Sequence, residues 1–102
     1  MRKITRRKAE RISRFIDENP NLKFTLTNHV FERLYERMGW TRREAIRHFR
    51  GREIVVSLSE GMMEIARDGA WKIHLFGLGK FVVLKNTDQQ GWTAVTFYPE
   101  AL

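Results

Sequence analysis

The chain has 102 residues, which is enough for one domain with one hydrophobic core and too few for two, so we expect a single domain over residues 1–102. Its hydrophobic content of 42% argues against disorder, and the absence of cysteine excludes disulfides, thiolate nucleophiles and thiolate zinc sites. No segment approaches the roughly 20 apolar residues of a membrane span, and the basic N-terminus lacks the apolar run of a signal peptide. We therefore expect a cytoplasmic protein without a membrane partner.

Positive charge is concentrated in the first half of the chain. Residues 1–50 hold 14 Lys and Arg against 6 Asp and Glu, a net charge of +8, whereas residues 51–102 hold 5 against 6, a net charge of −1, and the two sum to +7. This asymmetry favours a polyanionic partner: nucleic acid first, an acidic protein second and an anionic membrane surface third. A basic face that only aids solubility is the alternative.

A first amphipathic helix is predicted over residues 5–19, because apolar side chains recur there at helical spacing and the sequence ENP at 18–20 provides a stop. Its apolar positions are Ala9, Ile12, Phe15 and Ile16. Its outer face carries Arg6, Arg7, Lys8, Arg11 and Arg14, which either follow a phosphate backbone or face water. The next segment, LKFTL at residues 22–26, alternates between apolar and polar and indicates a short extended segment.

A second helix is predicted over residues 28–38, with Thr27 or Asn28 as its N-cap and Gly39 as a left-handed terminator. Its apolar stripe consists of Val30, Phe31, Leu34 and Met38.

A third helix over residues 42–50 follows at once. Thr41 and Glu44 form the Thr-x-x-Glu capping box at its start, and we expect Gly51 to end it. Its buried stripe consists of Ala45, Ile46 and Phe49.

After Gly51 the periodicity changes to that of strands. Four segments rich in β-branched and aromatic residues, separated by the turn sequences DG, GLG and NTDQQG, predict an antiparallel meander: residues 53–58, 70–76, 80–85 and 92–98. Residues 59–69 fit either a helical turn or a hairpin turn, and both alternatives stay open.

The fold class that we expect is α+β, with two or three N-terminal helices packed on one face of a roughly four-stranded antiparallel sheet. Along the chain this gives a basic N-terminal helix within residues 1–20, a helical pair within 27–51 and a β-meander within 52–99.

Three basic residues, His29, Arg33 and Arg37, are four residues apart in the second predicted helix. At 100° per residue they advance by about 40° per step, so they form a stripe beside the apolar face, where the helix meets the sheet. Like charges at this spacing repel slightly, so helix stability does not explain the arrangement. The alternative is a salt-bridged surface helix in which Glu32 and Glu36 pair with the arginines and the histidine has no role.

The segment TNHVFERLYERMGWTRREAI, followed by KFVVLK and the late TAVTFYP, resembles the small ribonuclease-toxin domains of the barnase/EndoU/colicin/RelE-like superfamily. The likeness is to its bacterial and phage branches, which begin with His-x-x-x-Arg-x-x-x-Arg on a helix and end with a Thr-x-Tyr strand. The match covers residues 27–50 and, in pattern, residues 70–98. The N-terminal helix is a departure from the family.

This resemblance implies a toxin-like endoribonuclease that needs no metal and cleaves RNA by attack of the ribose 2′-hydroxyl, leaving a cyclic phosphate. It implies His29 as acid or base, Arg33 and Arg37 as phosphate-binding groups, and Thr96 and Tyr98 as hydroxyls that face the same cleft from the last strand. A histidine suits proton transfer near neutral pH, and guanidinium groups suit the charge that accumulates on phosphate oxygens. The implied partners are RNA and an acidic antitoxin or other protein.

Other candidate residues carry weaker signals. Lys85 is a candidate for phosphate contact, or an edge-strand lysine without a further role. Thr96 and Tyr98 also fit a strand former and a half-buried core residue. His48 is expected to be exposed, whereas His74 alternates with apolar neighbours in a strand that could line the cleft. The three histidines of the chain lack the spacing of metal ligands, so we expect no metal and no cofactor.

Two further functions remain open. The helical pair joined by the sequence GWT resembles a helix-turn-helix, with Arg42 and Arg43 placed where a recognition helix reaches base edges. A non-catalytic phage-type inhibitor would instead use the basic N-terminal helices to block a nucleic-acid machine. The candidate nucleic-acid contacts are Arg6, Arg7, Arg11, Arg14, Arg42, Arg43 and Lys85.

Overall fold

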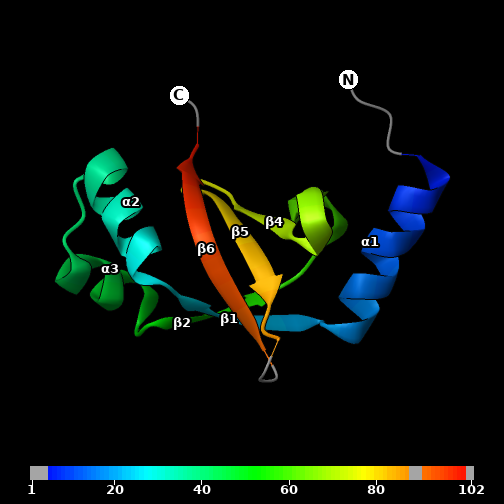
Figure 1. The fold of residues 1–102 in the computed structure, drawn as a ribbon, viewed down its shortest axis with the longest axis horizontal. Coiled ribbons are helices and arrows are strands. Elements are labelled where there is room, and N and C mark those ends of the chain that lie inside the picture. Colours follow the sequence, from blue (N-terminus) through cyan, green and yellow to red (C-terminus); the bar gives the residue numbers. More distant parts are fainter. Residues whose placement is uncertain (1–4, 88–90, 101–102) are drawn as a thin grey trace.

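The computed structural model describes residues 5–87 and 91–100, which form three α-helices and a six-stranded sheet (Figure 1). The helices are α1 (Arg6–Glu18), α2 (Asn28–Met38) and α3 (Arg42–Phe49). The strands are β1 (Asn21–Leu26), β2 (Glu53–Ser57), β3 (Met63–Ile65), β4 (Trp71–Leu75), β5 (Gly79–Lys85) and β6 (Trp92–Pro99). Residues 1–4 of the predicted N-terminal region, 88–90 of the predicted NTDQQG turn and 101–102 lie outside the described residues.

The predicted helices are confirmed to within one residue at each end, because local caps define them. Thr27 caps α2 by accepting a hydrogen bond from the Val30 amide at 3.4 Å, and Gly39 ends it in the left-handed conformation with φ 70°. The start of α3 has the expected capping box, in which the Thr41 hydroxyl accepts a hydrogen bond from the Glu44 amide at 3.2 Å.

The predicted end of α3 is wrong in one detail. Arg50, not Gly51, takes the left-handed position, with φ 60°. The Gly51 amide then donates to the Ile46 carbonyl at 2.8 Å, so the glycine lies one residue beyond the turn.

The sheet differs from the expected four-stranded meander. Its order is β2-β1-β6-β5-β4-β3, and β1 lies between β2, with which it is antiparallel, and β6, with which it is parallel. The alternating segment LKFTL forms β1, because its buried side chains Leu22, Phe24 and Leu26 contribute one apolar row to the core. The prediction of about four antiparallel strands is therefore wrong in number and only partly correct in pairing: β4 with β5 and β5 with β6 pair as expected, whereas β2 pairs with β1 instead of β4.

In the open segment 59–69, the structure has a hairpin turn near its end, because β3 and β4 are consecutive antiparallel strands joined through residues 66–70. A 3₁₀ turn, η1 (Glu60–Met62), leads into β3, and a second 3₁₀ turn, η2 (Arg67–Gly69), connects β3 to β4. β3 forms the far edge of the sheet by pairing with β4.

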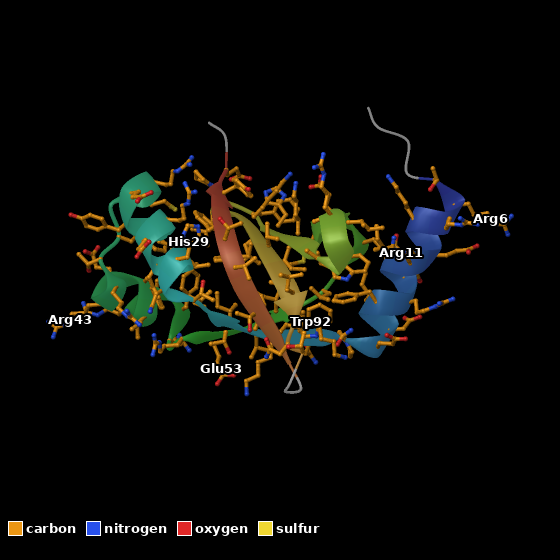
Figure 2. The ribbon with its side chains drawn as sticks, in the orientation of Figure 1. Arg6, Arg11, His29, Arg43, Glu53 and Trp92 are labelled. Atoms are coloured by element: carbon orange, nitrogen blue, oxygen red, sulfur yellow. The ribbon has the colours of Figure 1, made fainter. Side chains whose placement is uncertain are left out.

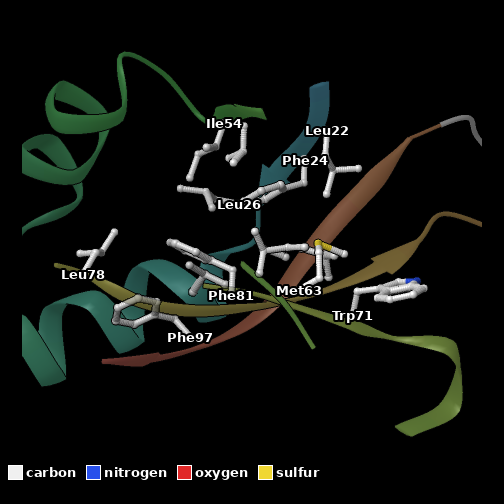
Figure 3. Close-up of a cluster of buried hydrophobic side chains, with 14 of the residues drawn as sticks. Leu22, Phe24, Leu26, Ile54, Met63, Trp71, Leu78, Phe81 and Phe97 are labelled. Carbon is white, nitrogen blue, oxygen red and sulfur yellow. The ribbon is translucent and has the colours of Figure 1, made fainter. Parts of the chain in front are cut away.

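The core lies inside the curled sheet, between the paired strands β1 and β2 and strands β3 to β6 (Figure 3). Phe24 and Phe81 pack with ring centroids 5.6 Å apart, and Phe81 and Phe97 with centroids 4.9 Å apart. All three rings are at most 1% exposed. Burying such rings is a large part of what stabilises a domain of this size.

The three helices do not form one layer on one face. Helix α1 lies at one end of the molecule, while α2 and α3 lie at the opposite end (Figure 1). Each still buries apolar side chains in the same core: Ile12 and Phe15 from α1, Leu34 from α2 and Ala45 from α3. The expected single helical layer is thus only partly correct.

A β-bulge decides which side chains of β6 face outward. Val82 of β5 pairs with Thr96, but Val83 pairs with Ala94, so the register skips Val95. Ala94 and Phe97 both face the core as a result, although they are three residues apart. Thr96 and Tyr98 are thereby turned to the outer face of the sheet.

Candidate functional site

The histidine of the predicted stripe lies beside one of its arginines on α2. The Nε of Arg33 donates to Nε2 of His29 at 3.4 Å, and Nδ1 of His29 lies 3.9 Å from a carboxylate oxygen of Glu32. The His29 side chain is 50% exposed. A ring nitrogen that accepts must be unprotonated, so this arrangement places the proton of the neutral imidazole on Nδ1, facing the carboxylate.

This stripe occupies the flank of α2 that faces away from α3. A groove of about 580 Å³ separates α2 from the start of α3, and its lining includes Phe31, Tyr35 and Arg42. At 100° per residue, Arg33 lies about 160° around the helix from both Phe31 and Tyr35. Figure 2 shows His29 on the side of α2 nearer to β6.

Helix α2 is joined to β6 at its first turn. The Thr27 hydroxyl donates to the Ala94 carbonyl at 2.9 Å while it caps the helix. The buried side chains Val30 and Leu34 pack in the same core as Ala94 and Phe97. These contacts fix the height and the rotation of the helix relative to the strand, and with them the position of the stripe.

The two hydroxyl residues of β6 share the outer face of the sheet. Thr96 and Tyr98 both line a groove of about 550 Å³ that also includes Glu64 and Lys72. Tyr98 in addition borders a second groove, of about 460 Å³, with Lys72, His74, Lys80, Pro99 and Glu100. The three residues of the α2 stripe line neither of these two grooves.

The structure therefore brings the predicted residues together in two groups. His29 contacts Arg33, with the exposed Arg37 one turn further along α2, and Thr96 lies near Tyr98 on β6. Lys85 joins neither group. It pairs with Trp92 at the opposite end of β6 from Tyr98, roughly 17 Å away along the strand, and its Nζ lies 5.9 Å from the Trp92 ring centroid.

Sequence reasoning missed two charged pairs on the outer face. Nε2 of His74 lies 3.2 Å from Oε1 of Glu100, and Nζ of Lys80 lies 3.0 Å from Oε2 of Glu64. Because Lys72 and His74 alternate with apolar residues along their strand, the sequence indicated that these two side chains share one face of the sheet. No local pattern could place the two carboxylates there, because they are 16 and 26 residues away in sequence from their partners.

The candidate nucleic-acid contacts lie at both ends of the molecule. Figure 2 shows Arg6 and Arg11 of α1 at one end and Arg43 of α3 at the other, along a longest dimension of 41 Å. The guanidinium group of Arg42 packs over the Phe31 ring, with its carbon 4.7 Å from the centroid. The basic half of the sequence thus forms two separate surfaces instead of one.

Among the described residues, no group of three or more His, Asp and Glu side chains is arranged to hold a metal ion. Nor does any described helix combine the length and the apolar character that crossing a bilayer requires. Comparison of the chain with known protein families, with curated proteins and with solved structures finds no match.

Proposed function

We propose that the chain is a toxin-like, metal-independent endoribonuclease whose reaction centre lies on the flank of α2 that borders β6. One observation carries the proposal: the exposed imidazole of His29 has a guanidinium group beside it, and its Nε2 lone pair points to that group. A base next to a fixed cation is what cleavage of a phosphodiester by an internal hydroxyl requires.

The reaction assigns a separate task to each group. Nε2 of His29 takes the proton of the ribose 2′-hydroxyl, and the 2′-oxygen attacks the adjacent phosphorus. The bond to the 5′-oxygen breaks as that oxygen takes a proton from water. The products are a 2′,3′-cyclic phosphate and a 5′-hydroxyl end. Arg33 releases the imidazole and pairs with the phosphate oxygens, since a phosphate binds guanidinium more strongly than a neutral ring nitrogen does.

Two further residues of α2, Arg37 and Glu32, support this reaction in the proposal. Arg37 lies one turn beyond Arg33 on the same flank and contributes a second positive charge. Thr96 and Tyr98 lie on the outer face of β6, in grooves that the α2 stripe does not line, so the proposal gives them no contact with this phosphate. Glu32 lies on the Nδ1 side of the imidazole, with a carboxylate oxygen 3.9 Å away, and its negative charge favours a proton on that nitrogen, which leaves Nε2 to act as the base.

Purified protein incubated with total RNA in the presence of a chelator tests this function. We expect fragments with cyclic-phosphate ends from the wild type and from His48→Ala, a change at an exposed histidine of α3, but not from His29→Ala. Intact RNA with the wild type, or equal cleavage by His29→Ala, would show that the proposed reaction does not occur. Expression in cells offers a second readout, because a toxin-like nuclease arrests growth and His29→Ala should relieve the arrest.

A second candidate function is nucleic-acid binding without cleavage, as in a protein that inhibits a host nucleic-acid machine. The observation that favours it is the number of exposed arginines on α1 and α3: Arg6, Arg7, Arg11, Arg14, Arg42 and Arg43. Such a protein would bind RNA or DNA with a steep dependence on salt, and the His29→Ala change would leave that binding unaltered.

A further inference from the structure

The second outer-face groove lies at the end of β4, β5 and β6, beside the turn that joins β4 to β5. Its lining residues are Lys72, His74, Lys80, Tyr98, Pro99 and Glu100. Its volume of about 460 Å³ falls in the range of about 300–1,000 Å³ that is usual for small-ligand sites. The α2 stripe is not part of it, so its role is a separate question.

Charge in this groove is largely compensated. Nζ of Lys80 lies 3.0 Å from a Glu64 oxygen, and Nε2 of His74 lies 3.2 Å from a Glu100 oxygen. A site that binds a phosphate group presents uncompensated cations, whereas here two of the basic groups already face carboxylates. The groove is therefore better suited to a ligand that offers a flat apolar surface with polar edges.

One aromatic ring, that of Tyr98, lines the groove, and a second, that of Phe76, lies beside it against the lining residue His74. Phe76, in the β4–β5 turn, is 72% exposed, and its ring centroid lies 4.8 Å from that of His74. Tyr98, on the strand next to β5, is 49% exposed. Glu100 holds this arrangement together, because its second oxygen accepts from the Gly77 amide at 3.0 Å while the first contacts His74.

We propose that this groove is a nucleobase-stacking subsite for single-stranded RNA, in which a base stacks on Phe76 and continues the existing contact between Phe76 and His74. Exposed aromatic rings bind single strands in this way, since every base has a π face that is free only when it is unpaired. The proposal rests on the proposed function for its choice of RNA as ligand. It extends that function by making an unpaired base, as well as a phosphate, a requirement for binding.

The test uses a short fluorescein-labelled 2′-O-methyl oligouridylate, whose blocked 2′-oxygen cannot attack phosphorus. Its affinity is measured by fluorescence anisotropy at one fixed salt concentration for the wild type, Phe76→Ala, Phe76→Trp and Tyr35→Ala. Tyr35 is a matched control, since it is an aromatic residue with 61% exposure on α2, away from this groove. Thermal unfolding of each variant shows whether it is folded.

We expect Phe76→Ala to weaken binding by about 5- to 150-fold, the range for loss of one base–aromatic stack, while Phe76→Trp and Tyr35→Ala bind like the wild type. Binding of a duplex of the same length should not change in any variant. The proposal is overturned if the wild type does not bind the oligonucleotide, if both alanine variants bind equally well, or if Phe76→Ala changes the oligomeric state instead. Because the probe cannot be cleaved, this result is independent of whether His29 catalyses cleavage.

Discussion

The hydroxyl group of Thr27 makes two contacts that join α2 to the sheet. It accepts a hydrogen bond from the Val30 amide at 3.4 Å as the N-cap of α2, and it donates to the Ala94 carbonyl of β6 at 2.9 Å. Thr27→Val removes the hydroxyl and keeps the shape of the side chain. Both contacts are then lost without creating a cavity.

The expected loss of stability is the sum of two moderate contributions. An N-cap contributes typically about 1 kcal/mol, and a hydrogen bond to a partly buried carbonyl contributes about 1 kcal/mol more, so Thr27→Val should lower the free energy of unfolding by about 2 kcal/mol. For a chain of this length that corresponds to a Tm lower by roughly 8–16 °C.

Urea denaturation followed by tryptophan fluorescence measures the effect, with the m value expected to stay the same because the surface exposed on unfolding is unchanged. Thr27→Ser keeps the hydroxyl and should remain within about 1 kcal/mol of the wild type. If Thr27→Val is as stable as Thr27→Ser, the hydroxyl does not join the helix to the strand, and the argument that these contacts position His29 fails.

Three further results are expected. Gly79→Ala should lower the free energy of unfolding by about 3 kcal/mol or more in the same assay, because a Cβ there would lie 2.2 Å from the Tyr98 carbonyl oxygen. Gly77→Ala is the control, since no atom lies within 4 Å of its Cβ position. It should cost only about 1–2 kcal/mol, for placing alanine in a left-handed backbone conformation. Phe97→Ala should lower the free energy of unfolding by about 3–5 kcal/mol, since the ring is fully buried, and a value below about 1 kcal/mol would contradict the described core. Arg7→Ala should reduce the slope of log affinity for single-stranded RNA against log salt by about 0.7, provided that α1 contacts phosphates, and an unchanged slope would exclude that contact for Arg7.

The helices could be predicted from the sequence because their signals are local. The cap of α2 at Thr27 and the box of Thr41 with Glu44 involve residues three positions apart, and the apolar spacing of each helix lies within it. The left-handed conformation of Arg50 could not be predicted in this way. Glycine is the usual residue at the left-handed position after a helix, so the neighbouring Gly51 was the better candidate from the sequence.

The sheet could be predicted only in part. Each long strand has its own composition, and all four expected strands were found within one or two residues. Their pairing is a property of the whole chain: β1 lies between β2 and β6 because its buried row, Leu22, Phe24 and Leu26, completes the core of the curled sheet. No local pattern could specify a parallel partner almost 70 residues away.

For the candidate site, the sequence by itself determined the spacing of His29, Arg33 and Arg37 on one flank of α2, since a helix fixes which of its residues are neighbours. Only the tertiary structure decided the surroundings of that flank. In a regular strand Thr96 and Tyr98 would share the face of Ala94 and be buried, and it is the bulge at Val95 that turns them outward. A bulge depends on the register between two strands, and the register is set by packing across the whole sheet.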